Sequence, residues 1–350
     1  MAKYIRDYTI TFLTDGDSSS KLVYTTIDKK NPLHITFSAS YDVGKPTASA
    51  ELSVYNMSPA SRRLLQSQDV KVMIEVGTRD TERLDDSPSM SKIFIGTVSE
   101  PLHTNTTNSD HVTRIKATSG YDIKEVTLDG RIDKAVTKLG VIEKICADIE
   151  SKCYGMVRFN LSYLKNSEGS TNKTRNKLLE DLKEIHPDGY SYTGSAQNCL
   201  NEAIRDLLLE SSIKSDGTIK LHKQSHSEGL EVFNIDQSNG LLTIPQPVAN
   251  KTGQANSDPR VVKGYSFKTL LLPQISVNDR VNVTHPAFSI NSDLIVQSVK
   301  FSGGYESSQW YSTIKANFES DEDAEKNIAE YSLGTAQDIN YYKLLTGETS

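Results

Sequence analysis

The chain has 350 residues, of which 36% are hydrophobic and 24% are charged, and its formal net charge at pH 7 is -6. This balance is typical of globular domains that bury sizeable cores, and it excludes the disordered and fibrous classes of protein. The length predicts two or three domains, and the negative net charge argues against a DNA-binding surface as the main function.

Three cysteines, Cys146, Cys153 and Cys199, lack the Cys-x-x-Cys spacing that zinc sites usually show. Their odd number predicts reduced cytosolic thiols. Residues 1–8 mix charges with short apolar side chains and lack the core of a signal peptide, and no stretch approaches the apolar length of a membrane span. We therefore expect a protein that is made in the cytoplasm, stays soluble and does not insert into a membrane.

The first part of the chain alternates between apolar and polar residues, as strands do. Residues 4–13 and 21–27 alternate on either side of a turn-forming stretch at 15–20, which predicts a hairpin. Residues 33–41 and 49–55 alternate in the same way. Their predicted inner faces consist of Leu33, Ile35 and Phe37, and of Ala50, Leu52 and Val54. Four half-buried strands are hard to reconcile with a helical domain.

A short helix is expected next, because Ser58 can accept a hydrogen bond from a first turn that starts at Pro59. The polar and charged residues 78–91 are too hydrophilic to be buried and predict a long hairpin loop. Further strands are expected at residues 69–77, 93–98 and 112–117. The first domain then ends near residue 125.

Beyond residue 125 the period changes to that of helices. Apolar residues recur at spacings of three and four after Thr137 and after Ser195, so each of these residues is predicted to cap an amphipathic helix. The first helix carries Leu139, Ile142, Ile145, Cys146 and Ile149, and the second carries Ala196, Cys199, Leu200, Ala203, Ile204, Leu207 and Leu208. Between the helices, residues 163–183 are charged and polar and are either an insertion or a mobile loop.

Asn239 and Gly240 tolerate positive φ and predict a turn. Pro245 and Pro247 remove N–H donors, so the chain cannot continue there as an interior strand. It is expected to leave one sheet and enter another through an exposed polar interval at residues 249–260.

The last strands are expected at residues 261–268, 275–284 and 310–318. A buried corner of Leu270, Leu271 and Leu272 is predicted between the first two, and a turn at Asn278 and Asp279 within the second. Gly303 and Gly304 predict a hairpin turn before the closing strand. The inner face of that strand consists of Trp310, Ser312, Ile314 and Ala316.

Three segments resemble the central hub protein of contractile phage tail baseplates. The amino-terminal segment reads AELSVYNMSPASRRLL and precedes the strands DVKVMIEVG and IFIGTV. The middle segment reads GYSYTGSAQNCLNEAIRDLL and IKSDGTIKLHKQ, and the last reads GLLTIPQP, GYSFKTLLLPQISVNDRVNV and LIVQSVKFSGGYESSQWYSTIKA. Met57 and Ser61 depart conservatively from the family pattern, and Leu272 replaces the Asn of its leucine turn. Asn278 replaces a turn Gly, and Asn also adopts positive φ.

The resemblance covers about residues 1–320 and implies an α+β, mainly β fold with two β-barrel domains of hub type and an inserted α/β middle domain. The expected parts are a first tube-like barrel at residues 1–125, a middle domain at 126–240, a second tube-like barrel at 241–319 and an acidic tail at 320–350. Leu270, Leu271 and Trp310 are expected where the apolar faces of the second barrel meet.

In the hub family two barrels per chain form a trimeric ring, which joins the sixfold tail tube to the threefold central spike and lines the central channel. The resemblance therefore implies a structural, non-enzymatic protein of a phage tail, prophage tail or tailocin. Expected partners are two further copies, the tail tube or tube initiator protein, the central spike and the baseplate wedge proteins, with DNA only as passing cargo. The implied location is the virion tail baseplate, after assembly in the bacterial host cytoplasm.

Two other functions stay open. A distal tail adaptor or a carbohydrate-binding module of a noncontractile tail would be favoured by aromatic clusters in a cleft. A tail-associated cell-wall hydrolase would need a further domain, and no part of the sequence is left over to form one.

Chemical motifs are sparse, and we expect no catalytic, cofactor-binding or metal-binding residues. His222 and His226 are spaced i, i+4 but lack a Glu or Cys at ligand spacing, so a surface loop is expected there. The acidic pairs at 85–86 and 180–181 are interpreted as solvated faces. Cys146 is expected to be a core residue, because no motif ties a histidine to it. Glycine-rich nucleotide loops and the Gly-x-Ser-x-Gly elbow are absent from the sequence.

Overall fold

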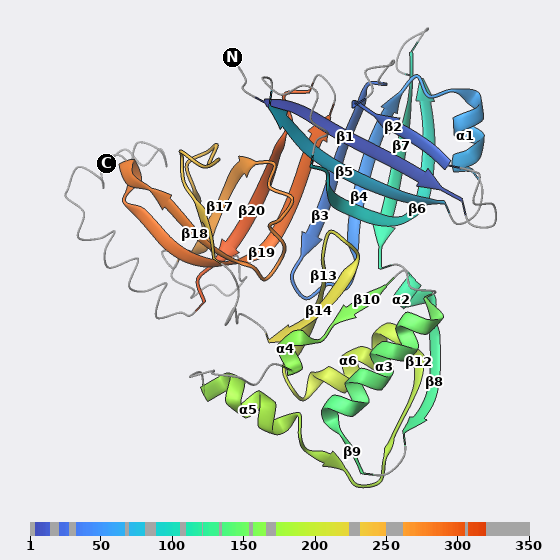
Figure 1. The fold of residues 1–350 in the computed structure, drawn as a ribbon, viewed down its shortest axis with the longest axis vertical. Coiled ribbons are helices and arrows are strands. Elements are labelled where there is room, and N and C mark those ends of the chain that lie inside the picture. The colour runs from blue at the N-terminus through green and yellow to red at the C-terminus, as the bar shows by residue number, and fades with distance from the viewer. Residues whose placement is uncertain are drawn as a thin grey trace, which may run out of the picture. The chain divides into compact units, whose positions relative to one another are not determined.

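The structure of the chain is a computed structural model, drawn as a ribbon in Figure 1. It describes residues 4–14, 21–27, 33–66, 70–80, 89–105, 110–120, 122–132, 135–153, 157–165, 173–223, 232–249, 262–304 and 307–319. The chain divides into two compact units. Unit 1 comprises Met1–Gln224, Leu271–Val277 and Ser298–Ser312, and unit 2 comprises Ser225–Leu270, Asn278–Gln297 and Thr313–Ser350. Of the described residues, 55% lie in strands and 20% in helices, which confirms the expected mainly β fold.

Unit 1 contains an antiparallel sheet in the strand order β19-β3-β4-β7-β6-β5-β1-β2. Its strands are β1 (Tyr4–Leu13), β2 (Lys21–Thr25), β3 (Ile35–Asp42), β4 (Ala48–Tyr55), β5 (Lys71–Asp80), β6 (Ser91–Asn105), β7 (His111–Ser119) and the second half of β19 (Ile290–Gly304). Residues 298–304 of β19 pair with residues 36–42 of β3. A strand from the carboxy-terminal part of the chain therefore completes a sheet that is otherwise built from residues 4–119.

The inner face of this sheet follows the predicted alternation. In β3 and β4 every second residue is buried, because side chains of a strand point to opposite faces of the sheet and only one face meets the core. The buried residues are Ile35, Phe37, Ala39 and Tyr41 in β3 and Ala48, Ala50, Leu52 and Val54 in β4. Leu33 lies before the strand and is only half-buried.

Aromatic contacts show that the sheet of unit 1 curls around its core. Tyr8 of β1 meets Phe37 of β3 edge to face, with ring centroids 5.8 Å apart, and Phe37 meets Trp310 in the same way at 6.1 Å. The Arg6 guanidinium donates to the carbonyl oxygen of Ser307 at 3.3 Å and lies 6.0 Å from the centroid of the Trp310 ring. Trp310 thus packs against Phe37 of β3 within unit 1. No closed barrel is found among the described strands.

The predicted first helix is confirmed as α1 (Pro59–Leu65). Ser58 caps it, because its Oγ accepts a hydrogen bond from the backbone N–H of Ser61 at 3.1 Å. The expected polar loop at residues 78–91 is shorter than predicted. Residues 78–80 extend β5 and Ser91 begins β6, since cross-strand pairing in the sheet continues past the apolar residues.

The two predicted helices of the middle region are confirmed as α3 (Lys138–Lys152) and α6 (Ala196–Arg205), which pack against each other (Figure 1). Thr137 Oγ1 accepts from Gly140 N at 3.1 Å, and Ser195 Oγ accepts from Asn198 N at 3.3 Å. Both caps therefore lie where the sequence predicts them. The expected inner face ends at Leu207, because Leu208 follows with a φ of 54° and is exposed.

Short strands and helices surround this helix pair. They are α2 (Asp122–Glu125), β8 (Thr127–Ile132), β9 (Val136–Thr137), β10 (Arg158–Asn160), α4 (Ser162–Lys165), α5 (Lys173–Asp181), β11 (Ile185–His186), β12 (Tyr190–Ser195), β13 (Leu209–Ile213) and β14 (Thr218–Lys223). Strand β8 pairs with β12, β9 pairs with β11, and β10, β14 and β13 form a three-stranded sheet.

Of the two alternatives for residues 163–183, the mobile loop is wrong for the part that the structure describes, and the insertion stays a prediction. These residues contain part of α4 and all of α5, and four of their apolar side chains are buried. These side chains are Tyr163, Leu164, Leu178 and Leu182. A few apolar residues among many polar ones are enough to hold short helices when tertiary packing buries one face.

The strands of unit 2 belong to one hydrogen-bonded sheet. They follow each other in the orders β16-β17-β20 and β15-β18-β19, where β19 contributes its first half. The strands are β15 (Val232–Ile235), β16 (Gln246–Ala249), β17 (Val262–Leu270), β18 (Arg280–His285) and β20 (Tyr311–Asn317), and a 3-10 turn η1 (Pro286–Phe288) follows β18. Pro247 lies in β16, which pairs with β17 alone, so the prediction that the prolines exclude an interior strand is confirmed.

The turn before β18 is also as predicted. Asn278 has a φ of 64°, and its N–H donates to the carbonyl oxygen of Val296 at 2.8 Å. The chain needs a residue that tolerates the left-handed region here, and Asn fills that role in place of Gly.

The leucine corner and the Gly-Gly turn differ from their predictions. Leu271 is buried, whereas Leu272 is half-buried and 46% of Leu270 is exposed, because Leu270 still belongs to β17 and points to its outer face.

Gly303 and Gly304 lie within β19. Gly303 is opposite Phe37, and a Cβ on Gly303 would lie 2.4 Å from Cζ of that ring. Glycine is therefore needed there to let the Phe37 ring lie flat against the strand.

Some expectations fall on residues outside the described ranges. These are the turn at 15–20, the polar interval at 249–260 apart from residue 249, and the tail at 320–350.

The contact between Trp310 and Phe37 predicts a large effect of truncation. Trp310→Ala removes a side chain that is 95% covered and leaves a cavity beside the Phe37 ring. We expect the free energy of unfolding to fall by about 3 to 5 kcal/mol, measured by urea denaturation. Lys315→Ala on the exposed face of β20 is the matched control and should change it by less than about 0.5 kcal/mol. Equal stability of the two variants would contradict the packing described for Trp310.

Candidate functional site

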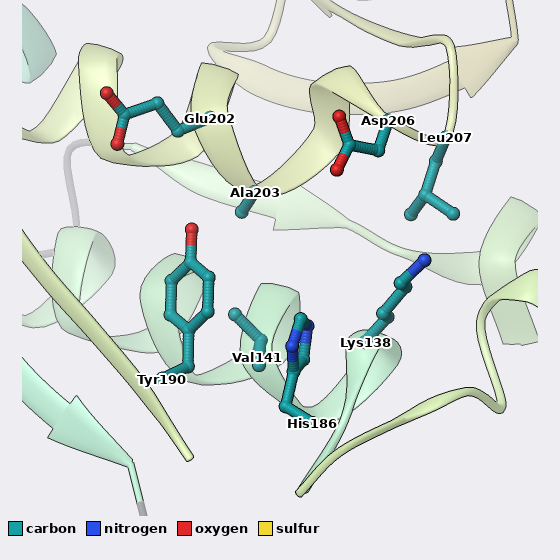
Figure 2. Close-up of a pocket in the computed structure, with 8 residues that line it drawn as sticks. All are labelled: Lys138, Val141, His186, Tyr190, Glu202, Ala203, Asp206 and Leu207. Carbon is teal, nitrogen blue, oxygen red and sulfur yellow. The ribbon is translucent and has the colours of Figure 1, made fainter. Parts of the chain in front are cut away.

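A small cleft lies between α3 and α6 (Figure 2). Its volume is about 40 Å³, which holds a few water molecules, whereas sites for small organic ligands reach several hundred Å³. The lining residues are Lys138, Val141, His186, Tyr190, Glu202, Ala203, Asp206 and Leu207. Figure 2 shows Glu202 on α6 and Asp206 directly after it, across the cleft from Lys138, His186 and Tyr190.

Two residues that line this cleft, Lys138 and Tyr190, keep their ordinary protonation states. Lys138 Nζ forms an ion pair with Glu184 Oε2 at 2.6 Å. This hydrogen bond raises the pKa of Lys138 and lowers the pKa of Glu184, so both stay charged. Burial raises the pKa of Tyr190, which keeps its hydroxyl protonated. To act as a general base, either residue would need a lowered pKa, which would make the lysine neutral or the tyrosine ionised near pH 7.

A wider, open cleft of about 670 Å³ lies beside α3, β10 and α4. Three of its charged residues, Glu143, Glu150 and Lys165, are already used in contacts within the chain. Glu150 Oε1 accepts from the N–H of Phe159 at 2.6 Å, and Lys165 Nζ pairs with Glu143 Oε1 at 2.7 Å. Burial, and after it the charges of Glu150 and Glu143, raise the pKa of Cys146, so this residue is a thiol and not a thiolate. The three cysteines are all free and buried.

His222 is the titratable residue that the sequence places wrongly. It is fully buried in β14, and its Nε2 accepts from Ser212 Oγ at 2.8 Å. Ser212 Oγ in turn accepts from the N–H of Gly44 in the β3–β4 turn at 3.0 Å, and His222 Nδ1 donates to the carbonyl oxygen of Lys223 at 3.3 Å. The prediction that His222 lies in a surface loop is therefore wrong. No local signal marks it as buried, because both faces of this hairpin are covered.

The other residues that the sequence singled out do not converge on a site. His226 and the pair at 85–86 lie outside the described residues, while Glu180 is exposed and Asp181 half-buried at the end of α5. Within the described ranges, no three His, Cys, Asp or Glu side chains are grouped so that they could hold a metal ion. None of the helices in those ranges has the length and apolar character needed to cross a membrane.

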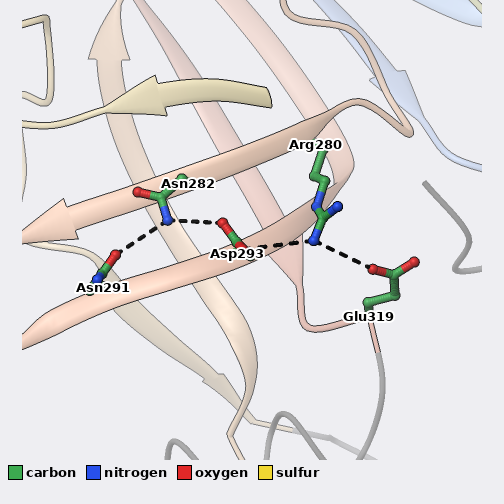
Figure 3. A network of polar contacts seen from close by, with 5 residues as sticks. All are labelled: Arg280, Asn282, Asn291, Asp293 and Glu319. Carbon is green, nitrogen blue, oxygen red and sulfur yellow. Dashed lines mark hydrogen bonds and ion pairs between the residues drawn. The ribbon is translucent and has the colours of Figure 1, made fainter. Parts of the chain in front are cut away.

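A polar network covers the outer face of β18 and β19 in unit 2 (Figure 3). Asn282 Nδ2 donates to Asn291 Oδ1 at 3.2 Å and to Asp293 Oδ1 at 2.9 Å. The guanidinium of Arg280 lies 3.7 Å from Asp293 Oδ2 and 4.0 Å from Glu319 Oε2. These are cross-strand contacts between neighbouring residues on one face of a sheet, and they stabilise the pairing of the strands.

Some strand edges and a group of exposed aliphatic side chains stay uncovered in the described part of the chain. In the described part of the chain, β2 pairs only with β1 and β16 only with β17. Leu242, Ile244 and Leu270 are 50%, 41% and 46% exposed, and we call them the aliphatic patch. The bridge between Leu241 and Thr269 turns those two residues inward, so Leu242 and Leu270 point outward together. Such edges and patches are typical of surfaces that bind another protein.

Two solved structures share the fold of this chain over most of its length. A tail protein from Neisseria meningitidis MC58 aligns with a TM-score of 0.53 at 9% identity, over 89% of this chain and 96% of its own. The 43 kDa tail protein of prophage MuSo2 from Shewanella oneidensis aligns with a TM-score of 0.51 at 8% identity, over 89% of this chain and 97% of its own. A type VI secretion component from E. coli aligns with a TM-score of 0.45 at 9% identity, over 82% of this chain and 74% of its own. No protein-family model and no curated protein sequence matches the chain.

The buried histidine predicts a pH-dependent stability. Burial lowers the pKa of His222 from 6.5 to about 4, so the folded chain keeps the imidazole neutral while the unfolded chain protonates it. The free energy of unfolding should therefore fall by about 3 kcal/mol as the pH drops from about 6.5 to 4. Denaturation at a series of pH values measures this loss. His222→Gln keeps an acceptor for Ser212 but does not titrate, so its stability should fall less over the same range. An equal fall in both proteins would contradict the assignment to His222.

Proposed function

We propose that this chain is a structural protein of a phage tail or a related assembly, and specifically the baseplate hub of a contractile tail or tailocin. The observation that carries the proposal is the fold shared with two phage tail proteins over 89% of the chain. The hub-like segments of the sequence occur in the same order as in that family, which supports the narrower role.

In this proposal residues 1–125 and 241–319 are the two tube-like domains, residues 126–240 are the middle domain and residues 320–350 are a peripheral acidic tail. Three copies form a ring in the virion tail baseplate that joins the tail tube to the central spike, with wedge proteins outside and DNA passing through the channel. The curled sheet of unit 1 supports the tube-like role, because a curved sheet presents one concave and one convex face.

The free edges and the aliphatic patch support assembly with further copies. Strand β2 belongs to unit 1, and β16 and the patch belong to unit 2. An uncovered strand edge or apolar patch promotes unwanted association with other chains. Burial of both in a ring would prevent that association. Stable interfaces of this kind bury about 2,000 Å² or more.

We also propose that the chain is not an enzyme and holds no cofactor. The two clefts support this, because Lys138 is charged and hydrogen-bonded and Cys146 is a buried thiol. Activated nucleophiles and bases have pKa values shifted in the other direction.

The hub role predicts a trimer. The purified chain, alone or mixed with its spike protein, should show a mass of three copies by mass photometry. The double variant Leu242→Ser/Leu270→Ser should weaken assembly and leave the melting temperature of the single chain nearly unchanged, because both side chains are about half exposed.

Leu208→Ser is the matched control, since Leu208 is 67% exposed but lies outside the patch. It should assemble like the unchanged chain. A population of monomers only, even with the spike present, would refute the hub role.

The structural role also predicts no hydrolysis of peptidoglycan. A zymogram of the purified chain should show no cleared band, because the Lys138 amine and the Cys146 thiol, one in each cleft, are held in their unreactive forms. A band that disappears in His186→Gln or Glu202→Gln would favour the hydrolase alternative and place its site in the cleft between α3 and α6.

A further inference from the structure

Three basic or protonatable side chains meet near α1 at one end of the unit 1 sheet. Arg62 lies on α1, His103 on β6 and His111 on β7. His103 is directly opposite Thr113, and His111 is two residues along β7 from Thr113. The two residues are therefore diagonal neighbours on one face of the sheet, a relation that places backbone positions about 7–8 Å apart. His111 Nε2 donates to the carbonyl oxygen of Met57 at 3.2 Å, which holds the segment before α1 against β7.

Two polar atoms of this cluster are buried without a partner. They are Nε of Arg62 and Nε2 of His103. The other ring nitrogen of His103, Nδ1, is hydrogen-bonded to Thr113 Oγ1 at 3.0 Å. Within the described residues the Arg62 guanidinium has no hydrogen bond and no ion pair. Buried polar atoms without a hydrogen-bond partner are rare in folded proteins, and each costs free energy that a partner would recover.

Among the described residues, no carboxylate forms an ion pair with Arg62, His103 or His111. The pKa of His103 is lowered, first by burial and then by the positive charges of Arg62 and His111. Asp110 precedes His111, and its Oδ1 accepts from Asn56 Nδ2 at 3.1 Å. No carboxylate contributes to the pKa of His103, so nothing offsets the effect of the two positive charges on it. Like charges held together without a counterion are unfavourable, so the geometry calls for an anion.

We propose that Arg62, His103 and His111 form a binding site for a tetrahedral oxyanion such as a phosphate group. A guanidinium presents a planar fork of N–H donors that matches two oxygens of an oxyanion, and a protonated imidazole donates to a third. Because the Arg62 guanidinium has no partner and its side chain is only half-buried, it is free to turn toward the anion. The site does not depend on the proposed role in a tail, since it is built within unit 1.

Inorganic phosphate is the probe, and NMR of the histidine side chains in the full chain is the first measurement. Phosphate should raise the pH midpoint at which His103 titrates, because the anion favours the protonated imidazole. The His103 signal is assigned by its loss in His103→Gln. Sodium chloride at the same ionic strength is the reference, because screening alone acts equally in both salts.

Thermal unfolding is the second measurement. At pH 6 and equal ionic strength, phosphate should raise the melting temperature relative to chloride by on the order of 3 °C, because the ligand binds the folded chain. Sulfate should act like phosphate, since it presents the same tetrahedral oxygens.

Arg62→Gln should abolish both effects, and Arg62→Lys should retain part of them, because lysine keeps the charge but not the planar fork. Arg63→Gln is the matched control, since Arg63 is the exposed neighbour on the same helix, and it should bind phosphate like the unchanged chain. Equal effects of phosphate and chloride, or full phosphate binding by Arg62→Gln, would overturn the proposal. If Arg62→Gln fails to fold, the His103 midpoint of the unchanged chain still decides, because a midpoint unmoved by phosphate refutes the site.

Discussion

The pairing of β19 with β3 is the contact on which the rest of the structure depends. It joins residues 298–304 to residues 36–42, and so brings a strand from near the end of the chain into the amino-terminal sheet. The first half of β19 pairs with β18 in unit 2, so one strand contributes to both units. Contacts between residues this far apart in sequence close a large loop. The chain loses the conformational entropy of that loop before the packing contacts can stabilise it. The sheet of unit 1 is therefore complete only when nearly the whole chain has been made.

Features that depend on neighbouring residues could be predicted from the sequence. The caps at Thr137 and Ser195 need only a side-chain oxygen followed by a helical apolar period, and both were found where this pattern occurs. The positive φ at Asn278 follows from the turn chemistry of Asn. The alternation in β3 and β4 gave the correct inner face, because one face of that sheet is buried and the other is not.

Features that depend on distant residues could not be predicted in this way. Two adjacent glycines indicate a turn locally, yet Gly303 is required in a strand because the Phe37 ring covers it. His222 has a polar neighbourhood in sequence, yet the β3–β4 turn covers it through Ser212. The candidate anion site has the same character, since Arg62, His103 and His111 belong to no common motif and meet only through strand register and the position of α1. In each of these three cases the outcome depends on contacts with residues that are distant in the sequence, so the local pattern cannot predict it.

The electrostatic state of the titratable groups connects these observations to the proposed structural role. Lys138 is held charged by Glu184, the thiol of Cys146 is held protonated, and His222 is held neutral. In each case the surroundings favour the form that makes the existing contact, which stabilises the fold but leaves no reactive group. The cluster around His103 is different, because its surroundings oppose positive charge without providing a partner. Within the described residues, Nε of Arg62 and Nε2 of His103 are buried without a hydrogen-bond partner, and the proposed anion would supply an acceptor for the Arg62 N–H.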